Sequence, residues 1–208
     1  MASPNGGIVG VDNEPESGTQ AEVITTFNAS GTLTTAPRTT DVQYVIVAGG
    51  GGGDAAAAGA GGGGAGGYRS SVPGENSGGG ASAEPLSPVT GAGFVPSPSN
   101  PATLKNGGSG GGASYSTGGG SGTPGQGYPG GNASLNRGGG GGGGAGQAGD
   151  GPVGPAEPPP EHGWDGGDGV ASSITGTPVY RAGGGGSVGR FTNNGIVGQG
   201  GLGGGANG

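Results

Sequence analysis

The 208-residue chain contains no cysteine, one histidine, one tryptophan and one lysine. The lack of cysteine excludes a disulfide framework and a thiolate metal site. Most enzyme sites need a nucleophile beside a base, or paired buried carboxylates, and no such arrangement is visible here. The glycine patterns that match a dinucleotide fingerprint are followed by no helix-forming stretch, and Lys105 precedes Asn106 rather than serine or threonine. We expect a protein that is not an enzyme and binds no cofactor.

Charged and apolar residues are also scarce. The chain is 9% charged and 27% hydrophobic, against about 25% and 45–50% in a typical soluble domain. Its net charge is −7 and its six basic residues are dispersed, which argues against nucleic-acid binding. No apolar stretch approaches the ~20 residues of a membrane span, so we expect no membrane insertion. The first residues lack a basic and an apolar region, so we expect synthesis in a cytoplasm.

Glycine dominates instead, with 65 residues, accompanied by 17 prolines. Long helices are nearly excluded, because each interior glycine costs about 1 kcal/mol relative to alanine. From residue 49 onward, glycine runs alternate with polar interruptions that contain turn residues. The run 138–144 breaks the three-residue frame of collagen. A flexible linker is the plain alternative, but linkers rarely place valine, isoleucine and tyrosine segments between their glycine runs.

Three regions are expected along the chain. Residues 1–21 are polar and indicate a flexible or attachment arm. Residues 22–48 contain alternating β-branched residues and predict a small antiparallel β-unit of two or three strands, with 41–48 its most strand-like part. Residues 49–208 form the glycine-rich body. The predicted fold class is mainly β and irregular, with essentially no α-helix.

Polyglycine can adopt an extended threefold helix of polyproline-II type, which has no internal hydrogen bonds. Each amide and carbonyl must then find a partner on a neighbouring run. Only glycine lets the backbones approach closely enough. The sequence therefore predicts a body of packed polyglycine-II helices, with full disorder as the competing interpretation.

Several segments resemble the glycine-rich domain of tail fibre and adhesin proteins of tailed bacteriophages, especially those that infect marine bacteria and cyanobacteria. They are VQYVIVA (42–48) with the glycines 49–53, GGGGAGGYR (61–69), TTFNASGTLTT (25–35), GTPGQGYPGGNAS (122–134), the run 138–146 and SSITGTPVYRAGGGG (172–186). The resemblance covers residues 22–190. It implies a structural protein located in the virion, whose partners are other tail or fibre proteins and a bacterial surface receptor, with a homotrimeric mount.

Aromatic side chains in the interruptions are the candidate host-surface contacts, because rigid aromatic groups on loops commonly anchor recognition. The candidate residues are Trp164, His162, Tyr128, Tyr115 and Phe94. Tyr68 and Tyr180 are expected instead to cap the ends of the polyglycine helices or to pack on the β-unit. Glu161, Asp165 and Asp168 lie near His162, but a polar loop is favoured over a metal site.

Two other functions stay open at this stage. A self-assembling filament or sheath protein would propagate the lattice or the strands between subunits. An ice-binding protein built on polyglycine-II helices would need a flat, regular face of threonine or alanine, and the threonines here are irregularly spaced.

Overall fold

The computed structural model describes residues 22–37, 39–54, 59–75, 77, 90–91, 93, 105–114, 118–133, 138–152, 162–189 and 197–208. It divides the chain into two units, Met1–Thr39 and Thr40–Gly208. No α-helix occurs in the described residues, where the regular elements are short antiparallel strands. The predicted class, mainly β and irregular, is confirmed.

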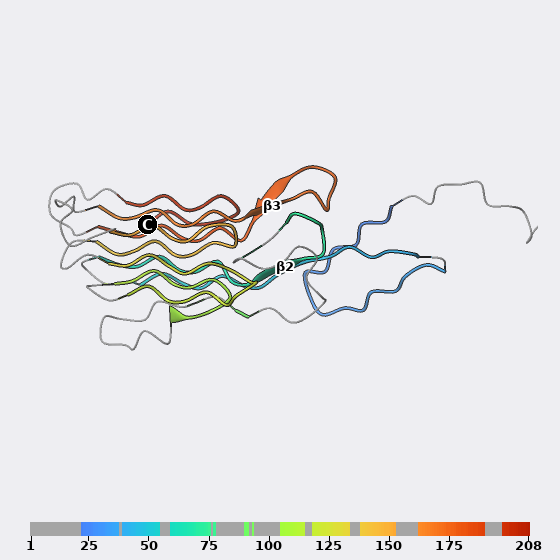
Figure 1. Cartoon of the computed structure of the whole chain (residues 1–208), viewed down its shortest axis with the longest axis horizontal. Helices are drawn as coiled ribbons and strands as arrows, with labels where there is room; N and C mark the ends of the chain where they lie inside the picture. The colour runs from blue at the N-terminus through green and yellow to red at the C-terminus, as the bar shows by residue number, and fades with distance from the viewer. Residues whose placement is uncertain are drawn as a thin grey trace, which may run out of the picture. The chain divides into compact units, whose positions relative to one another are not determined.

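Two pairs of three-residue strands lie in the second unit. β1 (Val45–Val47) pairs with β2 (Tyr68–Ser70). β3 (Val170–Ser172) pairs with β4 (Val179–Arg181). Most of the described residues of this unit form instead extended runs that lie side by side (Figure 1). The runs comprise residues 48–54, 60–67, 105–114, 118–123, 127–133, 138–145, 147–152, 162–169, 182–189, 197–202 and 204–208.

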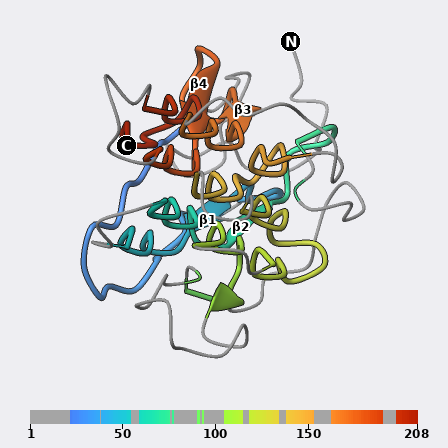
Figure 2. The ribbon, with the colours of Figure 1, turned by 90° about the vertical axis from the view of Figure 1, so that its left-hand side faces the viewer.

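The hydrogen bonds of run 138–145 repeat every three residues. The amides of Gly139, Gly142 and Ala145 donate to residues 188, 185 and 182 of one neighbouring run. Those of residues 140 and 143 donate to residues 113 and 110 of a second run, and those of 141 and 144 to residues 150 and 147 of a third. A period of three is that of a polyglycine-II helix. Figure 2 shows such runs end-on as small triangular coils.

Three further runs donate to the carbonyl groups of run 138–145. The donors are residues 62 and 65 of one run, 128 and 131 of another, and Gly167 of a third. Run 138–145 therefore has six hydrogen-bonded neighbours. This is the most completely enclosed run among the described residues, and it contains the longest unbroken glycine sequence of the chain. The enclosure explains the glycines, because a side chain on this run would overlap a neighbouring run.

A Cβ atom at Gly141 would lie under 3.0 Å from the carbonyl oxygen of Asp165, and one at Gly142 under 3.0 Å from that of Gly63. Real Cβ atoms essentially never approach backbone atoms so closely. The close approach of backbones thus excludes even alanine at these positions.

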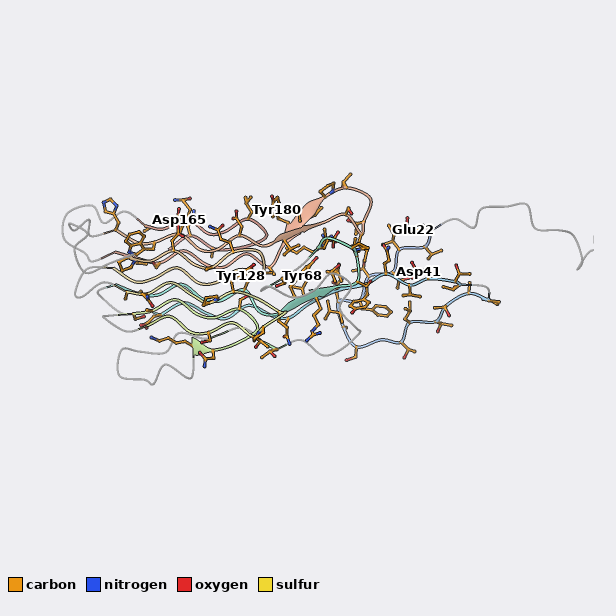
Figure 3. All side chains as sticks on the ribbon, viewed as in Figure 1. Glu22, Asp41, Tyr68, Tyr128, Asp165 and Tyr180 are labelled. Atoms are coloured by element: carbon orange, nitrogen blue, oxygen red, sulfur yellow. The ribbon has the colours of Figure 1, made fainter. Side chains whose placement is uncertain are left out.

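Runs at the edge of the body carry side chains on the residues that face outward. Ser121 is exposed in run 118–123, and Pro129 and Asn132 are exposed three residues apart in run 127–133. Gln199 and Leu202 repeat this spacing in run 197–202. Figure 3 shows side chains standing off the outside of the body. The same threefold period therefore decides where the sequence departs from glycine.

The strands continue the register of the runs. Val47 pairs with Tyr68 in β1–β2, and the next bonds join the amides of Ala48 and Gly51 to the carbonyls of Gly67 and Gly64. Likewise, Ser187 and Gly184 of run 182–189 donate to Trp164 and Gly167 in the register of β3–β4. Each strand pair is thus the end of a pair of runs, where larger side chains resume.

The prediction of a β-unit within residues 22–48 is therefore wrong. β1 is the only strand among the described residues of that range, and its partner is β2. Residues 22–39 belong to the other unit, where Val23 and Ile24 are 82% and 54% exposed. An alternating pattern favours extended backbone but does not select a partner. The bonds of the adjoining glycine runs select it here. The predicted arm, residues 1–21, lies outside the described residues.

A small apolar cluster lies where the strands meet the runs. It comprises Tyr68, Ala65, Ala145 and Ala182, with Val45 and Val170 packed against them. Tyr68 is fully buried, as expected, whereas Tyr180 is 48% exposed and lies in β4, at the end of a pair of runs. Because this cluster is so small, the hydrogen-bonded backbone supplies most of the interior of the described body.

Candidate functional site

The run ends near His162 define one end of the body, called here the His162 end. Gly138 lies against the carbonyl of His162 and forms a bridge with Gly189. The amide of Gly61 donates to the hydroxyl of Ser114 at 3.1 Å, which brings two more run ends to this side. The opposite end, which holds β2 and β3, is called the strand end (Figure 1).

Five segments outside the described residues are bounded by run ends that lie at the His162 end. These segments are 55–58, 115–117, 134–137, 153–161 and 190–196. At the strand end, by contrast, the chain reverses through described turns such as 124–126 and 174–177. The two ends of the body therefore differ in how their runs are connected: five segments outside the described residues begin and finish at the His162 end, and four of these segments contain polar residues.

Trp164 is held at the His162 end by its backbone. Its amide donates to Oγ of Ser187 at 2.7 Å, and its carbonyl accepts the amide of Ser187 at 3.0 Å. A Cβ at Gly198 would collide with the same carbonyl. The side chain is half-buried, and Nε1 is 3.8 Å from the position that a Cβ would take on Gly138. The backbone of Trp164 is thus fixed, while its indole ring stays partly exposed.

His162, Asp165 and Asp168 are spaced three residues apart and lie on one face of run 162–169 (Figure 3 labels Asp165). Oδ1 of Asp165 accepts the amide of Gln199 at 2.7 Å, and Oδ1 of Asp168 accepts that of Leu202 at 2.7 Å. These carboxylates hold run 197–202 in place. Burial, together with the negative charge of Asp165, raises the pKa of Asp150 above its usual value.

The candidate contact residues do not form one patch. Tyr128 is half-buried and donates its amide to Gly144, near the strand end, whereas His162 and Trp164 lie at the other end. Tyr115 and Phe94 lie outside the described residues. Of the five predicted residues, the structure therefore groups only His162 and Trp164.

The described residues contain no group of three or more histidine or acidic side chains that could hold a metal ion. Glu161, the neighbour of His162, is outside them. Nor do they contain a helix long and apolar enough to cross a membrane.

Sequence reasoning missed a polar cluster at the strand end. Glu75 accepts hydrogen bonds from Tyr68 at 3.2 Å and Ser70 at 2.9 Å. Burial and the charge of Glu75 raise the pKa of Tyr68 to about 12. Glu75 follows the turn Pro73–Gly74, and no motif marks it in the sequence. The cluster joins segments of the strand end.

Comparison of the chain with family models, with curated proteins and with solved structures gave no match.

Proposed function

We propose that this chain is a non-enzymatic virion protein, a phage tail fibre or fibre-tip adhesin that attaches the particle to the bacterial surface. The observation that carries the proposal is the division of the body into two unlike ends. Four interruptions that contain polar residues, 115–117, 134–137, 153–161 and 190–196, are bounded by run ends at the His162 end, where Trp164 and His162 also lie. A rigid body that presents several connections on one side suits recognition, because binding residues are commonly carried on loops that a rigid scaffold positions.

The rigidity of the body supports the same role. Run 138–145 is bonded to six neighbours through its own amides and carbonyls. Such a body depends little on side chains, so interruptions at its end can change in sequence while the runs stay the same. The partners in this proposal are another tail or fibre protein and a receptor on the cell surface.

Localisation on purified particles tests the proposal. Antibodies against the chain, labelled with gold, should decorate the distal end of phage tails in electron micrographs, and mass spectrometry should find the chain in fixed proportion to other tail proteins. Decoration of the capsid, or absence of the chain from purified particles, would contradict it.

A self-assembling filament or sheath is the second candidate, because run 48–54 leaves an exposed glycine edge. Open-ended fibres formed by the purified chain would favour that role over an adhesin. The outward positions of the described runs support an ice-binding face less well. They carry glutamine, aspartate, proline and asparagine, such as Gln147, Asp150, Pro129 and Asn132, and no regular row of threonine.

A further inference from the structure

Run 48–54 lies at the edge of the body and contacts one described run along its length. Ala48, Gly51 and Asp54 donate to Gly67, Gly64 and Gly61. The four glycines between these donors are all exposed. A Cβ on Gly49 or Gly52 would have no atom within 4 Å. Packing within the described chain thus gives no reason for glycine at these two positions.

Glycine is costly to order, and other edge runs place side chains on their exposed positions. Ser121, Pro129 and Gln199 occupy such positions. The other long glycine sequence, in run 138–145, is the one enclosed by six neighbours. Run 48–54 therefore contains consecutive glycines as the enclosed run 138–145 does, although the four glycines between its donors are exposed like the residues of an edge run.

A groove of about 500 Å³ lies beside run 48–54, lined by that run and by runs 60–67, 182–189 and 204–208. Runs 60–67 and 182–189 are bonded to each other, since Gly185 donates to Gly63 at 2.9 Å. They also both bond to run 138–145 on their other side. The groove therefore has the place of one further run in the packing of the body. Four of the six neighbours that an enclosed run would have are already present, namely the four runs that line the groove.

The backbone groups that lack partners fit this position. The amides of Ala60 and Gly63 have no hydrogen-bond partner among the described residues, while those of Gly62 and Ala65 donate to run 138–145. On the next run, the carbonyls of Gly183 and Gly186 accept no bond from any described group. All four residues are buried and line the groove or adjoin it. Buried backbone groups without partners are rare in folded proteins.

Asp54 adds a side-chain acceptor. It lines the groove, and its Oδ2 is buried without a hydrogen-bond partner in the described part of the chain. The groove thus presents donors and acceptors at a three-residue spacing, which an extended glycine run can satisfy and a helix or bulky strand cannot.

We propose that two copies of this chain associate through this edge, with run 48–54 of each copy seated in the groove of the other. A twofold axis between run 48–54 and the adjoining groove exchanges the two, so the contact is reciprocal and closed. Each seated run then receives new neighbours on its bare faces and supplies partners to Ala60, Gly63, Gly183 and Gly186. The inference does not depend on the proposed function.

Sedimentation equilibrium of the full chain tests this pairing. The dimer should have a mass of about 37 kDa, twice the 18.7 kDa of one chain. We expect it to predominate at about 100 µM, where a complex with a Kd near 1 µM is almost fully assembled. Gly52→Val places a side chain on the bare face of the run, and Gly185→Val places one in the groove, where its Cβ has 3.4 Å to the nearest atom. Both variants should sediment at the mass of a single chain.

Gly118→Val is the matched control, because Gly118 is exposed and its nearest neighbour would be 3.7 Å from the new Cβ. It should remain a dimer. Hydrogen exchange provides a second measurement: the amides of Ala60 and Gly63 should exchange more slowly as the protein concentration rises, and Gly52→Val should abolish that dependence. The proposal would be overturned by a wild-type chain that stays monomeric at this concentration or that has the mass of three chains. It would also be overturned if both Gly52→Val and Gly185→Val remained dimers.

Discussion

The backbone amide of Ser173 donates a 2.9 Å hydrogen bond to Oε1 of Glu75, a residue 98 positions earlier in the chain. The other carboxylate oxygen accepts bonds from Tyr68 and Ser70 of β2. One acidic side chain therefore fastens the turn after β2 to the segment that follows β3. It connects the two strand pairs through a side chain where no ladder joins them.

Replacing Glu75 with glutamine should destabilise the protein in a pH-dependent way. Burial by itself raises the pKa of Glu75, but the bonds from Ser173, Ser172, Ser70 and Tyr68 outweigh it and lower the pKa. A folded-state pKa below the unfolded one stabilises the protein above about pH 4.5, and this stability is lost as the pH falls through the folded pKa. We expect Glu75→Gln to lower the free energy of unfolding by about 2 kcal/mol at pH 7.

Urea unfolding of the wild type and of Glu75→Gln at pH 7 and at pH 3 measures this difference, which should shrink at the lower pH. Glu22→Gln is the control, because Glu22 is exposed. An equal difference at both pH values would show that the carboxylate charge does not contribute.

Gly141→Val should abolish folding of the body. A Cβ at this position overlaps the carbonyl of Asp165, and run 138–145 is bonded on all sides. The expected loss exceeds about 4 kcal/mol, the range reached only by severe core disruption. Limited proteolysis should digest the variant rapidly, while Gly118→Val keeps the resistance of the wild type. Unchanged resistance of Gly141→Val would contradict the close packing of the runs.

Ser109→Ala tests how much a buried serine within a glycine run contributes to stability. Ser109 is fully buried, and its hydroxyl donates to the carbonyl of Gly66 at 2.8 Å. Its loss leaves that acceptor short of one bond, and we expect a cost of about 1–2 kcal/mol. The control Ser121→Ala, at an exposed position, should change the stability by less than about 0.5 kcal/mol. Thermal unfolding of both variants compares them, and equal midpoints would refute the prediction.

The proposed adhesin function predicts that Trp164→Ala weakens attachment to the bacterial cells without unfolding the chain. Ser187 holds the backbone of Trp164 and is unaffected by loss of the indole. Truncating a recognition anchor typically costs about 2 kcal/mol or more, roughly thirtyfold in affinity. Tyr180→Ala removes an exposed aromatic ring from the strand end and serves as the control. Binding of fluorescent protein to the cells gives the affinities, and an equal loss in both variants would argue against Trp164 as a specific contact.

The close packing of the glycine runs could be predicted from the sequence, because only residues without a side chain let neighbouring backbones approach so closely. The seven glycines of 138–144 allow close approach on every side, and the structure encloses that run completely. Position in the body could be read from spacing too: Pro129 and Asn132 interrupt their run every third residue and face outward.

The strand partners could not be predicted. Val23, Ile24 and Phe27 have the composition of a strand, yet they are exposed and unpaired in the described structure. β1 joins β2 because the bonds between Ala48 and Gly67 already fix the register. That information resides in contacts between runs, which no local pattern carries.

The candidate site was predictable only in part. His162 and Trp164 are close in sequence and stay together at one end of the body. Tyr128 lies near the other end because its run reverses at the turn 124–126. Without the order and direction of the runs, an aromatic residue in an interruption cannot be assigned to either end.

The central claim is that backbone bonds between glycine runs hold the body together, and NMR couplings across those bonds test it most directly. In uniformly labelled protein, through-hydrogen-bond couplings should link the amide nitrogens of Gly139, Gly142 and Ala145 to the carbonyl carbons of Val188, Gly185 and Ala182. This pattern repeats every three residues and runs in opposite directions on the two partners. Couplings to carbonyls four residues earlier in the same run, or rapid exchange of these amides with no couplings, would contradict the account.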